Sequence, residues 1–203
     1  MTSTESSPVP PTAPKWLPLL LLAAVPVVCF VVGGIFLPAP KSAAEARANV
    51  DRSRLQGIVL SERPTPKNPV DAVLGDRIRV LGADLPDTPL SRGRGLGIHF
   101  YFEALREMDR DWTVFVHIDR EGGTYRIHGD HSPADGVYHT SLWQPGEHVK
   151  DPLDKLVPID APPGRYDVWL GFYIGDERLP FSKGDGSIHD GTNRVRVGQI
   201  VIQ

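Results

Sequence analysis

Apolar and polar residues alternate with a period of two along much of the C-terminal part of the chain. The pattern is clearest in GIHFYFEAL at 97–105, WTVFVHI at 112–118 and RYDVWLGFYI at 165–174. Because successive side chains of a strand point to opposite faces, each segment is expected to be a half-buried β-strand. The residues predicted on the buried faces are Ile98, Phe100, Phe102, Ala104, Trp112, Val114, Val116, Ile118, Tyr166, Val168, Leu170 and Phe172.

Shorter alternating runs lie between these segments and after them. They are DRIRVLG, TYRIHG, DKLVPI and RVRVGQIVIQ, and turn-forming clusters such as DREGG, APPG and KGDG separate the predicted strands. In the last run the apolar positions change parity around Gly198, which indicates a β-bulge. About seven strands in roughly 130 residues predict an all-β domain at 70–203, an antiparallel Ig-like β-sandwich.

A long apolar run near the N-terminus has a different character. WLPLLLLAAVPVVCFVVGGIFLPA at 16–39 contains no charged residue, and its length suits one helical crossing of a bilayer, which needs about 20 apolar residues. Its prolines do not exclude a transmembrane helix. A cleaved signal peptide is the alternative, but the run is longer than the roughly 7–15 residues of a signal core. We therefore predict a disordered tail at 1–15 and a single transmembrane helix at 16–39.

The segment 40–69 connects the apolar run to the predicted sandwich. Apolar residues in SAAEARANVDRSRLQGIVLSE recur at helical spacings, and Ser42 with Glu45 forms a capping-box pattern. The prolines of RPTPKNP at 63–69 disfavour helical backbone before them. The expected structure is a short juxtamembrane helix and a Pro-rich linker, and a mobile linker throughout is the alternative.

Charge and cysteine content exclude several classes of function. The 22 basic and 25 acidic residues are interspersed and leave a net charge of −3, so no basic stripe for nucleic acid is present. The single cysteine, Cys29, lies inside the apolar run, which excludes an intrachain disulfide and a thiol nucleophile in the domain.

The segment HGDHSPADGVYHTSLWQPGEHVKD at 128–151 is the richest in chemically active side chains. His128, Asp130 and His131, together with His117, are the candidate ligands of a transition metal. Their spacing matches no diagnostic metal motif, and no serine lies in a nucleophile elbow. We therefore predict a structured connection without a cofactor and without catalytic activity.

Aromatic residues supply the candidate binding surface. Trp169 and Tyr173 fall on the opposite face of their strand from the core residues, where they could stack on a sugar or contact a partner protein. Tyr138 and Trp143 are further candidate stacking residues. For Trp143, the sequence favours a position over the core of the sandwich and leaves a surface role as the alternative.

The order of motifs resembles a known domain. FVH at 115–117, DHSP at 130–133, WQPGE at 143–147, PPGRY at 162–166 and GFY at 171–173 are similar to the extracytoplasmic C-terminal β-sandwich of bacterial mannosyltransferase-type polytopic glycosyltransferases. The resemblance covers about residues 74–182. Those enzymes carry their catalytic residues in a many-helix membrane part, whereas this sequence predicts one span, so the resemblance implies a detached, non-catalytic module.

Two indications conflict about the side of the membrane on which the C-terminal domain lies. Lys15 precedes the apolar run, whereas Lys41, Arg47, Arg52 and Arg54 follow it, and this bias favours a cytoplasmic C-terminal domain. The resemblance implies an extracytoplasmic domain, and we follow it because the charge rule weakens for long translocated domains.

The predicted protein is a single-pass protein of the bacterial inner membrane with a periplasmic sandwich. It binds or scaffolds within a cell-envelope assembly. Its expected partners are the lipid bilayer, a protein of that assembly and, as a further candidate, a glycan. A carbohydrate-binding module and a metal-dependent periplasmic enzyme are the alternatives.

Overall fold

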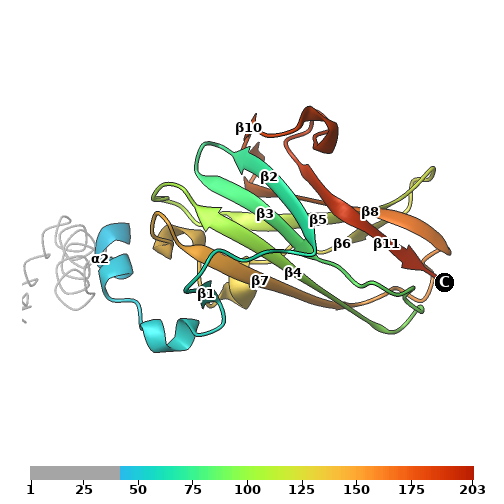
Figure 1. The fold of residues 1–203 in the computed structure, drawn as a ribbon, viewed down its shortest axis with the longest axis horizontal. Coiled ribbons are helices and arrows are strands. Elements are labelled where there is room, and N and C mark those ends of the chain that lie inside the picture. Colours follow the sequence, from blue (N-terminus) through green and yellow to red (C-terminus); the bar gives the residue numbers. More distant parts are fainter. Residues whose placement is uncertain (1–41) are drawn as a thin grey trace, which may run out of the picture. The chain divides into compact units, whose positions relative to one another are not determined.

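Strands dominate residues 42–203, which are the residues described by the computed structural model (Figure 1). The tail and the transmembrane helix predicted at 1–39 lie outside this range. Within it, no helix has the length and apolar character needed to cross a membrane.

Two antiparallel sheets form the domain. The larger sheet has the order β1-β7-β4-β3-β2-β10, with bounds Val59–Leu60, His148–Leu156, Gly95–Ala104, Ile78–Asp84, Asn68–Leu74 and Phe181–Lys183. The second sheet has the order β11-β8-β5-β6, with bounds Val195–Ile202, Gly164–Ile174, Thr113–Arg120 and Arg126–His128, and β9 (Glu177–Arg178) pairs with β8. The helical elements are short: α2 (Ala43–Ala48) and the 3₁₀ turns η1 (Arg52–Leu55), η2 (Pro133–Gly136), η3 (Thr140–Leu142) and η4 (Gly186–Ile188).

The core lies between the inner faces of the two sheets. Phe102 of β4 and Phe172 of β8 meet edge to face across it, with ring centroids 5.1 Å apart. All twelve residues predicted on the buried faces of 97–105, 112–118 and 165–174 are at most 4% exposed. The prediction of an antiparallel β-sandwich is thereby confirmed.

The C-terminal strand contains the predicted bulge. Its register against β8 shifts between Arg196 and Gly198. Gly198 has φ +144°, and a Cβ there would lie 2.6 Å from Leu85 Cδ1. Backbone conformation and space thus both require glycine, and the extra residue restores the inward direction of Ile200 and Ile202, which are buried.

Strand β7 differs from the sequence expectation. The strand predicted at DKLVPI instead begins at His148, inside the segment expected to be a connection. Proline is normally confined to edge positions because it lacks a backbone N–H. Pro152 meets this condition, since β1 pairs only with His148 and Val149, and within residues 42–203 no strand pairs with that side of β7 at Pro152.

The connector after residue 41 is folded against the sandwich. The Glu45 N–H donates to the Ser42 hydroxyl over 3.2 Å, which confirms the predicted start of the helix. The helix ends at Ala48 and the chain continues into η1, so it is shorter than the pattern suggested.

Two arginines attach this connector to loops of the sandwich. Arg47 donates to the carbonyl oxygens of Met108 and Ser141 at 3.0 and 2.8 Å, and Arg52 forms an ion pair with Glu147. The segment is therefore docked onto the domain, and the alternative of a mobile linker does not describe residues 42–60.

Candidate functional site

The second histidine of the predicted connection, His131, forms a structural ion pair. His131 Nε2 lies 2.9 Å from Asp151 Oδ2, and His131 Nδ1 lies 2.7 Å from the Gly129 carbonyl oxygen. The other carboxylate oxygen of Asp151 accepts the Ala134 N–H at 2.7 Å. Asp151 is completely buried. Its contacts with His131 and Ala134 hold the start of the loop onto β7.

These partners determine the direction in which the His131 pKa shifts. Burial disfavours the charged imidazole, but the hydrogen bond and charge of Asp151, together with the Gly129 carbonyl, outweigh burial and raise the His131 pKa. Both ring nitrogens face acceptors, so the charged ring donates twice. His131 therefore has no nitrogen left for a metal ion, and its place among the candidate ligands is corrected.

Tyr138 and Trp143 are core residues, each with 0% exposure. The indole Nε1–H of Trp143 donates to the Tyr138 carbonyl oxygen over 3.0 Å, and its ring lies 5.9 Å from that of Phe102 and 6.4 Å from that of Phe172. A ring without exposed surface cannot stack on a ligand, which corrects the binding role considered for both residues.

The turn after Trp143 is held by one carboxylate. Glu147 accepts hydrogen bonds from the Tyr138 hydroxyl at 2.6 Å and from the Gln144 N–H at 2.8 Å. Gly146 has φ +87°, as a Pro-Gly turn requires. The WQPGE motif is thus explained by its structural role. The remaining predicted site residues lie on the outer face of the second sheet, which is therefore the candidate surface.

We call this surface the Arg–aromatic face. It comprises outward-pointing residues of the β11-β8-β5-β6 sheet and the loops beside it: Phe115, His117, Asp119, Arg126, His128, Asp130, Asp167, Trp169, Gly171, Tyr173, Arg178, Asp190, Arg194 and Arg196.

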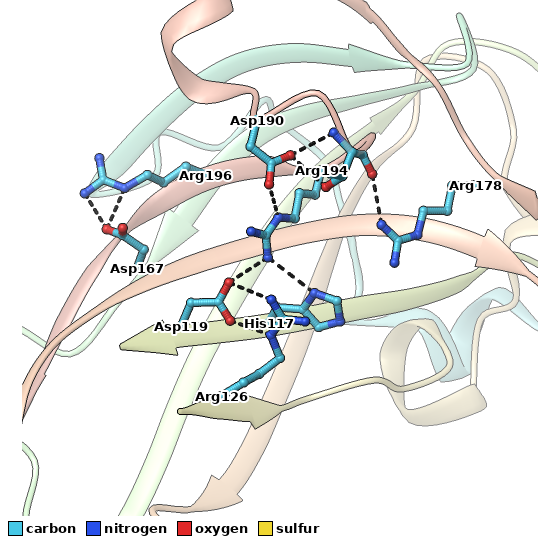
Figure 2. Close-up of polar contacts among 9 residues, drawn as sticks. His117, Asp119, Arg126, Asp167, Arg178, Asp190, Arg194 and Arg196 are labelled. Carbon is cyan, nitrogen blue, oxygen red and sulfur yellow. Dashed lines mark hydrogen bonds and ion pairs between the residues drawn. The ribbon is translucent and has the colours of Figure 1, made fainter. Parts of the chain in front are cut away.

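Carboxylates hold three arginines of this face, Arg126, Arg194 and Arg196, in place (Figure 2). Asp119 accepts from Arg126 at 2.5 and 2.9 Å and from Arg194 at 2.7 Å, and Arg194 also pairs with Asp190 at 2.5 Å. Burial opposes the charge of Asp119, but the two guanidinium groups outweigh it and lower the pKa of that carboxyl group. The network is ionised at neutral pH and restricts the rotamers of its members.

Guanidinium groups also lie over two of the aromatic rings. Arg194 Cζ is 4.5 Å from the centre of the Trp169 ring, and Arg178 Cζ is 4.5 Å from the centre of the Phe115 ring. These distances are typical of cation–π interactions. The Phe115 ring rests on Gly171, where a Cβ would lie 2.4 Å from its Cζ.

A shallow hollow opens beside these rings. It has a volume of about 280 Å³, and Phe115, His117, Asp130, Tyr173 and Arg178 are among its lining residues. Aromatic, cationic and anionic groups thus meet in one depression that is open to solvent.

Three of the four predicted metal ligands come together at one end of the hollow. His117 of β5 pairs in register with His128 of β6, and Asp130 follows two residues later. One potential ligand atom from each residue lies within 4.8 Å of the others. Asp130 Oδ1 accepts the Val116 N–H at 3.2 Å, which holds the carboxylate beside His117.

His117 differs from its neighbours in burial. It is 8% exposed, and burial followed by the charge of Arg126 lowers its pKa to about 4. The imidazole is therefore neutral at neutral pH. Its Nδ1 lies 3.4 Å from Arg194 Nη1, and since guanidinium only donates, Nδ1 accepts in this arrangement.

The arginines are what sequence reasoning missed. Period-two parity placed Trp169 and Tyr173 outward, and the same parity on β5 points Phe115, His117 and Asp119 outward. Arg178 and Arg194 lie on loop or edge segments, where alternation carries no information about direction.

Comparisons with protein-family models and with curated proteins found no match for this chain. The similarity to the C-terminal sandwich of mannosyltransferase-type enzymes consequently stays a prediction, and the function has to be argued from the site.

Proposed function

We propose that this chain is a membrane-anchored, non-catalytic binding module that uses its Arg–aromatic face to contact a protein partner. In this proposal the sandwich is Ig-like and periplasmic, and the partner belongs to a cell-envelope assembly of the bacterial inner membrane. The uncharged run at 16–39 supports the anchor, and the resemblance to an extracytoplasmic domain supports the location.

The observation that carries the proposal is the composition and rigidity of the face. Tryptophan, tyrosine and arginine are the residues enriched at the energetic centres of protein interfaces. Here Arg194 is fixed by two carboxylates and lies over Trp169. Side chains that are already ordered lose less entropy on binding, which favours association.

The same contacts favour a protein over a sugar. Stacking on a sugar ring requires an open aromatic face, whereas guanidinium groups occupy faces of Trp169 and Phe115. Arg178 is exposed and donates to the Thr192 carbonyl oxygen, and within residues 42–203 no carboxylate pairs with it. It can therefore receive a carboxylate from a partner in a bidentate manner.

Site-specific photo-crosslinking tests the proposal. A photoreactive amino acid at position 173 of the full-length chain should give a discrete protein adduct in membranes of producing cells. The matched control is position 99 on the outer face of the larger sheet, which should give none. Arg178→Glu should abolish the adduct at 173 by charge reversal.

Several outcomes contradict the proposal. No adduct at 173, the same adducts from 173 and 99, or an adduct insensitive to Arg178→Glu would each exclude this face as a protein interface. Glycan binding that is lost on Trp169→Ala would favour the carbohydrate-binding alternative. An inactive phosphatase reporter fused after Gln203 would refute the periplasmic location.

A further inference from the structure

We propose that His117, His128 and Asp130 bind a divalent transition-metal ion on the outer face of β5 and β6. This inference is independent of the proposed partner binding. It concerns a cluster whose members come from two paired strands and the residues that follow, a juxtaposition that the sequence spacing alone does not produce.

The geometry requires only a modest contraction. Ligand atoms at about 2.0–2.1 Å from a tetrahedral ion lie about 3.3 Å from one another. In the cluster the corresponding atoms lie within 4.8 Å. His128 and Asp130 are exposed, so their side chains can close on the ion, whereas the buried His117 supplies the rigid member.

The chemistry of the three groups suits such an ion. Two imidazoles and one carboxylate form the ligand set of many zinc and other first-row metal sites that keep an open position. The Val116 N–H holds Asp130 from behind, as supporting hydrogen bonds do in metal centres.

Charge around the cluster also permits a cation. Arg126 and Arg194 are paired with Asp119 and Asp190. Within the part of the chain that the structure describes, no arginine or lysine forms an ion pair with Asp130. The charges of Arg126 and Arg194 are thus offset by their carboxylate partners, and the Asp130 charge remains for the ion.

Among residues 42–203, Arg194 competes directly with the ion, because its Nη1 contacts His117 Nδ1 over 3.4 Å. A hydrogen bond of this length is weak. Replacing Arg194 by glutamine should therefore tighten metal binding, since it removes both the repulsion and the contact.

The hollow gives the ion an accessible coordination position. Three protein ligands leave at least one position for water or a carboxylate. His117 and Asp130 line the depression of about 280 Å³, with Arg178 and Tyr173 also on its wall. A bound ion could thus present an exchangeable ligand to a molecule in the hollow.

Calorimetric titration of zinc into the metal-free full-length chain tests the inference. We expect one site per chain, with binding weakened by at least about tenfold to a hundredfold in His128→Ala and in Asp130→Asn. His99→Ala, a histidine change on the other sheet, is the matched control and should leave the affinity unchanged. Cobalt(II) should give the visible absorption of a four- or five-coordinate ion in the wild type and lose it in both variants.

The variants are chosen so that unfolding does not obscure the result. His128 and Asp130 are exposed, and circular dichroism of each variant should match that of the wild type. Absence of a stoichiometric site, equal affinity in His128→Ala and wild type, or loss of binding in His99→Ala would overturn the inference.

Discussion

Replacing Asp151 by alanine should lower the free energy of unfolding by about 3–5 kcal/mol, the cost of breaking a buried ion pair by removing one partner. Asp151 has no exposed surface and accepts from His131 Nε2 at 2.9 Å and from the Ala134 N–H at 2.7 Å. Alanine removes the acceptor of both donors, and the Ala134 N–H then stays buried without its partner.

Asp151→Asn is the matched variant with nearly the same shape. Its amide oxygen can still accept the Ala134 N–H, and its amide nitrogen can donate to His131 Nε2 once that ring is neutral. A neutral hydrogen bond then replaces a charged one, so the expected cost is only about 1 kcal/mol.

The pH dependence identifies the charge. The folded-state pKa of His131 is raised above the ordinary value of 6.5. The contribution of the His131–Asp151 pair to the free energy of unfolding is therefore complete below pH 6.5 and is lost as the pH rises through the folded-state pKa. The wild type should lose stability over this range, whereas Asp151→Asn should not, and the two curves should converge at higher pH.

Urea denaturation followed by tryptophan fluorescence, in buffers from about pH 5 to about pH 9, measures these differences. The reasoning would be refuted by a cost below about 1 kcal/mol for Asp151→Ala. It would equally be refuted if Asp151→Asn lost as much stability as the wild type when the pH rises.

Three further changes test the core and the Arg–aromatic face by the same denaturation assay. Trp143→Ala should cost about 3–5 kcal/mol, because it empties a fully buried site. Gly171→Ala should cost about 1–3 kcal/mol, because its Cβ would lie 2.4 Å from the Phe115 ring. The wild type should lose stability as the pH falls from 6.5 towards about 4, because His117 takes up a proton on unfolding in that range, and His117→Gln should abolish this loss. Glutamine is chosen because it still offers an acceptor to Arg194.

Each change has a control. Trp169→Ala, on the outer face, should cost about 1 kcal/mol or less, and an equal cost at Trp143 would argue against its burial. Gly95→Ala adds a Cβ that meets nothing within 4 Å, so a similar loss there and at Gly171 would point to strand propensity and not to the Phe115 ring. If His117→Gln shows the same loss of stability between pH 6.5 and about 4 as the wild type, another group takes up that proton.

Local pattern was sufficient for the three main strands, β4, β5 and β8, and for their faces. The residues predicted inward on β4, β5 and β8 are buried, and Trp169 and Tyr173 point outward as parity required. The bulge at Gly198 was also visible as a change of parity. These features depend on side-chain direction, which alternates along a strand whatever its neighbours are.

Strand β7 and the His131 pair were beyond local pattern. Pro152 argues against a strand until the strand order shows that, among the described residues, no strand pairs with one side of β7 at that point. The histidines of 128–151 look equivalent in sequence, yet His131 turns to the buried Asp151 while His128 meets His117 across a strand pair.

Residue type and period were enough to establish that the described part of the chain is a disulfide-free β domain and to show which face of each main strand is apolar. The folded arrangement was needed to show that Tyr138 and Trp143 lie inside, that Arg178 and Arg194 cover aromatic rings, and that His117, His128 and Asp130 converge. Those facts depend on strand order, register and loop closure, which bring together residues far apart in the chain.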